Sequence, residues 1–131
     1  MSAILADTHA FVRYLFQPNL LSKKAAVAFD QSLQAEGCIY LSSISLVELY
    51  YLIEKKRLSK EVLSGLKIKI AEGIFKIVPL DYDITNAIPK IPRSIVADMP
   101  DRIIAATAFS LKIPLITADH QIRKTTVNTI W

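Results

Sequence analysis

The sequence has 131 residues, of which 52% are hydrophobic, and its 16 lysines and arginines exceed its 12 aspartates and glutamates to give a formal net charge of +4. This length is sufficient for one hydrophobic core, so we expect residues 1–131 to form a single domain. One cysteine excludes a disulfide within the sequence, and three glycines argue against a glycine-rich phosphate-binding loop. The absence of any run of about 18 apolar residues excludes a membrane-spanning helix, and the lack of a basic leader before Asp7 predicts a cytoplasmic protein.

Short apolar segments alternate with segments of helical periodicity along the whole chain. The apolar segments predict strands at residues 3–6, 38–41, 75–80, 113–117 and 127–130. Helical spacing, caps and breaks predict helices around 11–16, from 22 to 35, from 42–45 to about 57, from 59 to 73, around 81–88, from 100 to 112 and, as a single turn, near 120–124. This alternation predicts an α/β fold with a central parallel sheet of about five short strands and helices on both faces.

The helix predicted after residue 42 carries an acidic residue in an unusual place. Ile44, Val47, Tyr51 and Leu52 recur at helical spacing and predict an apolar inner stripe that also contains Glu48. A charged carboxylate on such a stripe costs several kcal/mol unless a raised pKa, a metal or a basic partner compensates it. A salt bridge to an inward-reaching lysine or arginine is the ordinary alternative.

Three more acids occupy comparable positions. Asp7 and Asp119 each follow a predicted buried strand, and Asp101 begins the helix that leads into the strand before Asp119. Together with Glu48 they are expected to reach the same edge of the sheet, where parallel α/β proteins gather their chemistry. Carboxylates brought this close repel by roughly a few kcal/mol per pair, so protons or a cation must relieve them. Oxygen ligands alone favour Mg²⁺ or Mn²⁺ over zinc.

Taken singly, each of these three acids has an ordinary structural explanation that needs no metal. Asp7 suits a helix cap, Asp101 complements a helix dipole, and Asp119 suits a turn. Asp98 lies three residues before Asp101 and is expected to be the N-cap of the same helix. The neighbouring residues expected to support the acids or to lie at the surface beside them are Thr8, Thr117, His9 and His120.

Four segments resemble the acidic motifs of one known family. Asp7-Thr8-His9-Ala10-Phe11, residues 42–49, 98–108 and 113–119 are similar, in order and spacing, to the four motifs of PIN-domain ribonucleases, and most of all to the VapC-type toxins of bacterial and archaeal toxin–antitoxin pairs. Any one motif is weak, whereas the ordered set is specific. One departure is Arg13-Tyr14, where many relatives carry a large apolar residue such as tryptophan.

The resemblance implies a Mg²⁺- or Mn²⁺-dependent endoribonuclease that forms a homodimer and binds a cognate antitoxin. It also implies roles for the acids, with Asp7 and Asp101 as principal metal ligands and catalytic residues, and with Glu48 and Asp119 completing the pocket.

The rest of the surface favours a polyanion such as RNA. Setting the four acids aside leaves 16 basic against 8 acidic residues, a net charge of +8, although composition alone fits an ordinary basic protein equally well.

Two functions are alternatives to a ribonuclease. One is a non-catalytic module of the same fold that binds RNA or protein, and the other is a phosphatase-like hydrolase. The second is disfavoured because His9 stands where a second acid is usual, two residues after Asp7. The expected substrate-binding residues are Arg13, Arg93 and Arg102.

Overall fold

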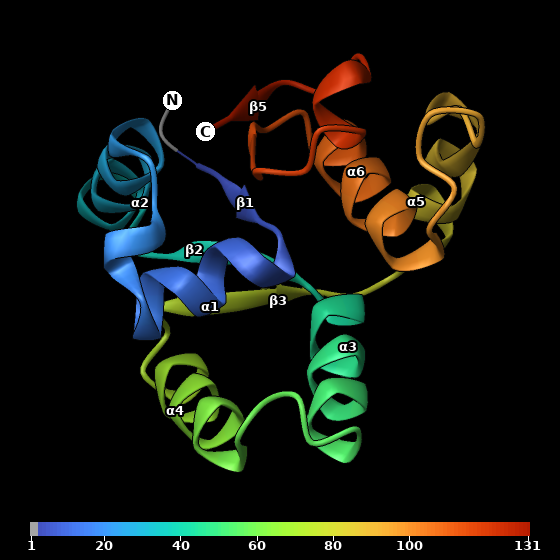
Figure 1. The fold of residues 1–131 in the computed structure, drawn as a ribbon. Coiled ribbons are helices and arrows are strands. Elements are labelled where there is room, and N and C mark those ends of the chain that lie inside the picture. The colour runs from blue at the N-terminus through green and yellow to red at the C-terminus, as the bar shows by residue number, and fades with distance from the viewer. Residues whose placement is uncertain (1–2) are drawn as a thin grey trace.

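Five parallel strands form one sheet in the computed structural model, which describes residues 3–131 and leaves residues 1 and 2 of the expected domain outside (Figure 1). The strands are β1 (Leu5–Ala6), β2 (Ile39–Ser42), β3 (Phe75–Val78), β4 (Leu115–Ile116) and β5 (Thr129–Ile130). Their spatial order is β3-β2-β1-β4-β5, and every neighbouring pair is parallel. The predicted parallel sheet of five short strands is therefore confirmed, with strands mostly shorter than the apolar segments that predicted them.

Six α-helices connect and cover the strands. They are α1 (Thr8–Phe16), α2 (Lys23–Glu36), α3 (Ser43–Glu54), α4 (Lys60–Ala71), α5 (Tyr82–Ala87) and α6 (Met99–Leu111). Single 3₁₀ turns follow α1, α5 and β4. They are η1 (Pro18–Leu20), η2 (Ile88–Lys90) and η3 (Ile122–Lys124). None of the helices within residues 3–131 combines the length and apolarity needed to cross a membrane.

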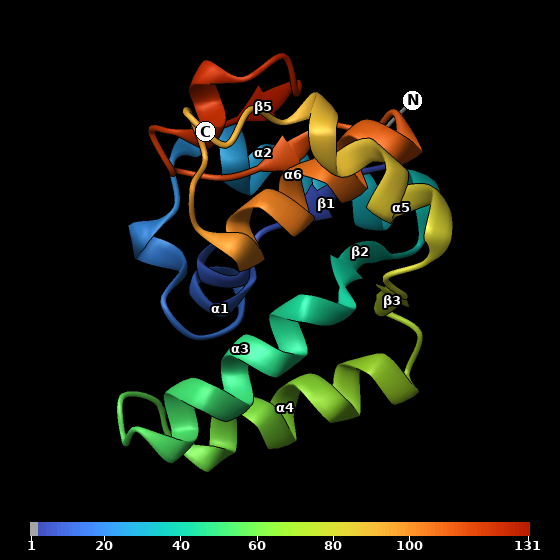
Figure 2. The same cartoon turned by 90° about the vertical axis from the view of Figure 1, so that its right-hand side faces the viewer.

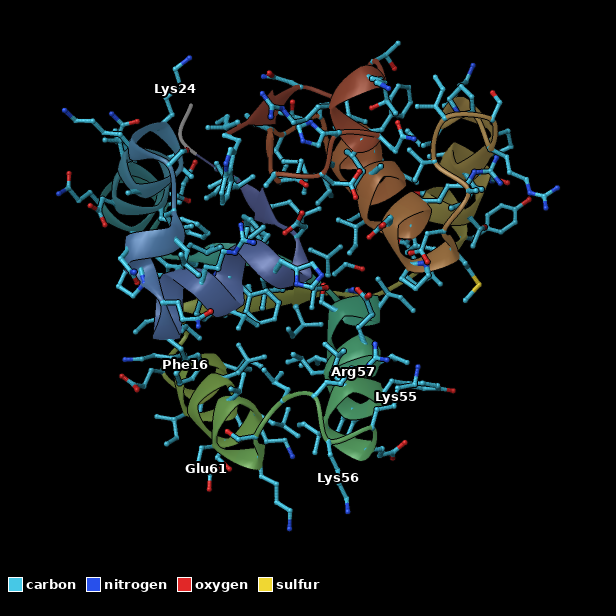
Figure 3. All side chains as sticks on the ribbon, in the orientation of Figure 1. Phe16, Lys24, Lys55, Lys56, Arg57 and Glu61 are labelled. Atoms are coloured by element: carbon cyan, nitrogen blue, oxygen red, sulfur yellow. The ribbon has the colours of Figure 1, made fainter. Side chains whose placement is uncertain are left out.

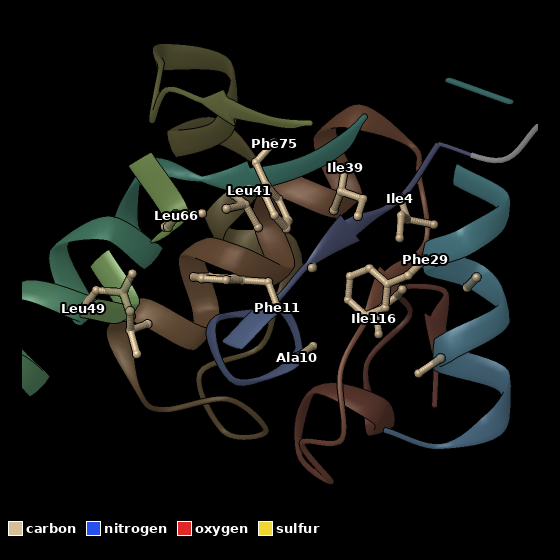
Figure 4. Packing of buried hydrophobic residues seen from close by; sticks show 14 residues of the cluster. Ile4, Ala10, Phe11, Phe29, Ile39, Leu41, Leu49, Leu66, Phe75 and Ile116 are labelled. Atoms are coloured by element: carbon tan, nitrogen blue, oxygen red, sulfur yellow. The ribbon is translucent and has the colours of Figure 1, made fainter. Parts of the chain in front are cut away.

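Alternating side chains along the strands build a core on each face of the sheet. One face packs on α1, α2 and α4, and the other packs on α5 and α6 (Figures 1 and 4). Residues paired across neighbouring strands share a face because the side-chain period of a strand is two. The row toward α5 and α6 is Leu5, Tyr40 and Leu115, and the row toward α1 and α2 is Ala6, Leu41 and Ile116. Helices on both faces are thus confirmed.

Short polar side chains start most of the helices, as the sequence suggests. Each accepts a hydrogen bond from a backbone N–H of the first turn, which satisfies a donor that the helix itself leaves free. α2 ends at Gly37 in the left-handed conformation, with φ of 72°, and α6 ends at Lys112 with φ of 57°. The capping residues are Asp7 for α1, Ser22 for α2, Ser42 for α3, Asp81 for α5 and Asp98 for α6.

The predicted inner stripe of α3 is partly wrong. Val47 is 46% exposed and Tyr51 is 60% exposed, whereas the buried residues of the helix are Ser45 and Leu49. The reason is that α3 extends away from the sheet instead of lying across a face of it (Figure 2). Its packed side is therefore set by α1 and α6, and the helix ends at Glu54, three residues before the expected end.

Candidate acidic metal site

The parallel sheet brings the ends of several strands to one edge. Asp7 follows β1 directly, and Asp119 follows β4 by three residues. α6 runs back toward the start of β4, so its first turn, with Asp101, lies at the same edge as the strand ends. Asp7, Asp101 and Asp119 line one cavity of about 230 Å³ together with His9, Arg13 and Trp131.

Asp7 is the most enclosed of the acids, with only 6% of its surface exposed. Its Oδ1 accepts a hydrogen bond of 2.8 Å from the Ala10 backbone N–H, which is the cap of α1. Burial raises the pKa of Asp7, while hydrogen bonds from Thr117 and Ala10 oppose that rise by favouring the ionised carboxylate. Asp7 therefore caps α1 and lines the acidic cavity at the same time.

Glu48 reaches the site through a hydroxyl on α1. The Thr8 hydroxyl donates to Glu48 Oε1 at 2.6 Å and lies 2.9 Å from the Ser45 hydroxyl, one turn before Glu48 on α3. Glu48 is half-buried, and burial raises its pKa although the Thr8 hydrogen bond lowers it. The alternative of a salt bridge to a lysine or arginine is not found, because within residues 3–131 the only ion pair joins Lys69 to Glu72. The Thr8 hydroxyl, rather than a basic side chain, holds this carboxylate.

The acidity of Asp101 is strongly perturbed. Asp98 caps α6 by accepting from the Asp101 backbone N–H at 3.2 Å, as the sequence suggested. Burial, followed by the charge of Asp98, raises the pKa of Asp101 to about 7. The other charges that raise it are those of Asp119, Glu48 and Asp7, which places these three acids within electrostatic reach of Asp101.

Asp119 is held by the turn that follows β4. Its Oδ1 accepts from the backbone N–H groups of Gln121 and Ile122, both at 2.9 Å, and its own N–H donates to the buried Thr117 hydroxyl at 3.0 Å. Thr117 thus touches the backbone of one acid and stabilises the carboxylate of another, Asp7. Both of these hydrogen bonds to the Asp119 carboxylate use Oδ1, which leaves Oδ2 to meet a ligand.

The donors of this site suit a hard divalent cation in their chemistry. They are carboxylate and hydroxyl oxygens, with no thiol nearby, and no lysine or arginine forms an ion pair with them in the described part of the chain. No three acidic, histidine or cysteine side chains of residues 3–131 already surround one point as a metal site would. Small side-chain rotations of the carboxylates would therefore have to complete a coordination shell.

The predicted basic residues and the histidines lie in different surroundings. Arg13 lines the acidic cavity, and His9 lies beside it with an exposed side chain. Arg102 donates from Nε to the Ile91 carbonyl at 2.8 Å, so part of its guanidinium is occupied in holding the loop before α6. Arg93 is exposed in that loop and does not line the cavity, and His120 is exposed. Only Arg13 of the three predicted arginines meets the acids in this cavity.

A second hollow of about 260 Å³ adjoins the first. Both are lined by His9 and Arg13, and the second also includes Arg57, which follows α3 (Figure 3). Lys55 and Lys56 are exposed just after α3, where basic side chains suit the helix dipole. Arg13 of α1 lines both hollows, and Arg57, three residues beyond α3, adds positive charge to the second.

Sequence reasoning missed two residues of the site, Ser45 and Trp131. Ser45 was hidden because the expected stripe placed the wrong side of α3 inward. Trp131 directly follows β5, just as Asp7 directly follows β1. The rule that placed Asp7 at the site, that residues after parallel strands meet at one edge, would have placed Trp131 there as well.

The raised pKa of Asp101 predicts how stability depends on pH when no metal is present. An acid whose pKa is about 7 when folded and near 3.8 otherwise binds its proton more tightly in the folded state. The free energy of unfolding should therefore fall as pH rises from 5 to 8, by about 1–2 kcal/mol once solvent screening is allowed for. Urea unfolding in EDTA measures this, and Asp101→Asn should flatten the profile. An equally steep decline in that variant would show that another group is responsible.

The fold and the site together define a small α/β domain with a carboxylate cluster suited to a divalent cation. The PIN domain family model matches residues 4–128. Ribonuclease VapC22 of Mycobacterium tuberculosis is 30% identical over 125 residues, which cover 94% of this chain and 92% of that protein. The chain belongs to the PIN domain family.

Solved structures have the same fold. VapBC2 from Rickettsia felis, bound to a DNA fragment from its promoter, matches with a TM-score of 0.70 and 16% identity over 97% of this chain and 96% of that chain. FitAcB from Neisseria gonorrhoeae matches with a TM-score of 0.66 and 25% identity over 96% of this chain and 95% of that chain. The resemblance predicted from four acidic motifs is therefore confirmed at the level of the family.

Proposed function

We propose that this protein is a divalent-metal-dependent endoribonuclease and the toxin of a type II toxin–antitoxin pair. The observation that carries the proposal is that Asp7, Asp101 and Asp119 line one cavity while Glu48 lies within electrostatic reach of Asp101, with no ion pair to neutralise any of the four. A domain retains such repulsion when a cation relieves it during function. The family and the relative that is named a ribonuclease support RNA hydrolysis as the reaction.

The acids are proposed to hold Mg²⁺ or Mn²⁺, with Asp7 and Asp101 as principal ligands and Glu48 and Asp119 completing the pocket. Such an ion, when bound, activates a water for in-line attack on a phosphodiester and stabilises charge on the leaving oxygen. The chain's own contribution is to fix these oxygens. The Ala10 amide and the Thr117 hydroxyl orient Asp7, and the turn after β4 orients Asp119.

The threonines are proposed to support the ligands without binding the ion themselves. Thr8 donates to Glu48 and therefore sets which carboxylate oxygen faces the pocket. Asp98 shapes the site in another way, because it fixes the start of α6 and adds a negative charge that raises the pKa of Asp101. This arrangement keeps Asp101 partly protonated until a cation arrives.

The proposed substrate is cellular RNA, and the proposed location is the cytoplasm. Arg13 is the best-placed residue to meet a phosphate, because it lines the cavity of the acids, and Arg93 and Arg102 are proposed to extend the basic surface. A solved structure of the same fold from Klebsiella pneumoniae is a toxin–antitoxin complex, which supports a cognate antitoxin as a partner of this chain. We also propose that the protein forms a homodimer, as the resemblance to VapC-type toxins implies.

Cleavage of total cellular RNA by the purified protein tests the function. With Mn²⁺ or Mg²⁺ we expect discrete RNA fragments whose ends map to the same cleavage sites, and with EDTA we expect no cleavage. Mn²⁺ should also raise the melting temperature, because a ligand that binds only the folded state stabilises it by about 2.7 kcal/mol at a concentration of roughly 100 times its Kd. RNA binding without cleavage in either ion would instead support the non-catalytic module.

A further inference from the structure

An aromatic side chain and an arginine form one wall of the acidic cavity. Trp131 and Arg13 both line it, and the Arg13 guanidinium carbon lies over the Trp131 ring, 5.5 Å from the ring centroid. Three carboxylates, those of Asp7, Asp101 and Asp119, line the same cavity. Two flat, polarisable groups therefore lie beside the oxygens proposed to act on a phosphodiester.

The fold places Trp131 there through strand pairing. β5 pairs with β4 in parallel, with Ile130 opposite Ile116, and the Thr117 backbone N–H donates to the Ile130 carbonyl at 3.2 Å. Trp131 is therefore level with Thr117, the residue whose hydroxyl supports Asp7. The ring is partly buried against the core that lies beside α1 and α2, so its position is constrained.

α1 places Arg13 on the same wall. Arg13 lies one turn after His9, and both side chains line the cavity, while Asp7 caps the start of the helix. An arginine beside three acids would ordinarily be expected to neutralise one of them. Arg13 forms no ion pair with any acid of residues 3–131, and its guanidinium lies over the indole instead. With Arg13 held against Trp131, the carboxylates are not neutralised by it and can bind a cation, and the N–H groups of the guanidinium can bind a ligand.

We infer that Trp131 and Arg13 form a nucleobase platform that holds one unpaired nucleotide next to the phosphodiester cleaved at the acidic pocket; the inference rests on the proposed ribonuclease activity. Aromatic rings and guanidinium planes both stack on bases, and they do so with little dependence on base identity. The N–H groups at the edge of the guanidinium add donors for the adjoining phosphate. Because a base in a duplex is already stacked, the platform selects single-stranded or looped RNA.

The fluorescence of Trp131 gives a direct test, since it is the only tryptophan in the sequence. The Asp101→Asn protein, which should bind RNA without cutting it, is titrated with a short single-stranded oligoribonucleotide. We expect saturable quenching by that oligonucleotide and no quenching by inorganic phosphate or duplex RNA. When each nucleotide in turn is replaced by an abasic one, the replacement at the position bound by the platform should weaken the quenching. Equal quenching by the abasic oligonucleotide would overturn the stacking.

Variants test the consequence for cleavage. Trp131→Leu keeps an apolar side chain but removes the aromatic face, and should raise KM for single-stranded RNA about tenfold with a smaller change in kcat. Trp131→Phe should stay within a few-fold of wild type, and Arg13→Lys, which keeps the charge but loses the plane, should resemble Trp131→Leu. A preserved Mn²⁺-induced rise in melting temperature shows that the acids are intact in each variant.

The outcomes separate the platform from the proposed function. Wild-type values of KM in Trp131→Leu, together with no quenching in the titration, would overturn the platform and leave the ribonuclease assignment standing. Base-dependent quenching in a protein that cleaves no RNA would overturn the assignment and leave a nucleotide-binding site. If Trp131→Leu does not fold, the titration and the comparison of Trp131→Phe with Arg13→Lys still decide the matter.

Discussion

Replacing Asp101 or Asp7 with asparagine is expected to lower the rate of RNA cleavage by roughly a thousandfold or more. Asparagine keeps the size and one oxygen of the side chain but removes the negative charge that holds a divalent cation. Asp7→Asn should retain the cap of α1, because asparagine also accepts a hydrogen bond at the start of a helix. The loss should therefore come from the missing charge and not from a displaced helix.

The same substitutions should leave the metal-free protein as stable as wild type or more so. The pKa of each of these acids is raised, which means that its ionised form is costly in the folded state at neutral pH. Single-turnover cleavage in Mn²⁺ and urea unfolding in EDTA measure the two effects. Asp81→Asn is the matched control, since Asp81 caps α5 in the same way without lining the acidic cavity. Unchanged cleavage in both Asp7→Asn and Asp101→Asn would defeat the assignment.

Phe11→Ala is expected to reduce the free energy of unfolding by about 3–5 kcal/mol, the usual cost of emptying a buried aromatic site. Phe11 is fully buried, and its ring packs at 58° to that of Phe75 with 6.1 Å between ring centroids (Figure 4). The total stability of a domain is typically about 5–15 kcal/mol, so the change removes a large share of it. Because Phe11 also fixes α1 against the sheet, the variant should lose metal binding at temperatures where it partly unfolds.

Phe16→Ala is the matched control on the same helix. The Phe16 side chain is 44% exposed and covers Gly65 of α4, so its removal opens little internal space (Figure 3). We expect a cost of about 1 kcal/mol or less. Urea unfolding followed by circular dichroism compares the two variants. Equal costs for Phe11→Ala and Phe16→Ala would contradict the division between the buried and the exposed side of α1.

Local features of the sequence were sufficient for the elements and for most of the acidic site. Ser22, Asp81 and Asp98 start their helices because a side-chain oxygen and a backbone N–H only a few residues away decide a cap. The short strands followed from apolar runs between turn residues. Asp7 and Asp119 could be placed at one edge because parallel strands end on the same side of a sheet, whatever the order of the strands.

Only the tertiary structure decided which neighbours these residues meet. Glu48 has a hydroxyl partner instead of the alternative lysine or arginine, and α3 buries Ser45 in place of Val47, because α3 extends beyond the sheet and packs against α1 and α6. Trp131 joins the acids because β5 pairs with β4. The sequence by itself determined the helices, the strands and the edge on which the acids gather, since these depend on residues close together along the chain. The contacts across that edge depend on strand order and helix packing, which bring together residues distant in sequence.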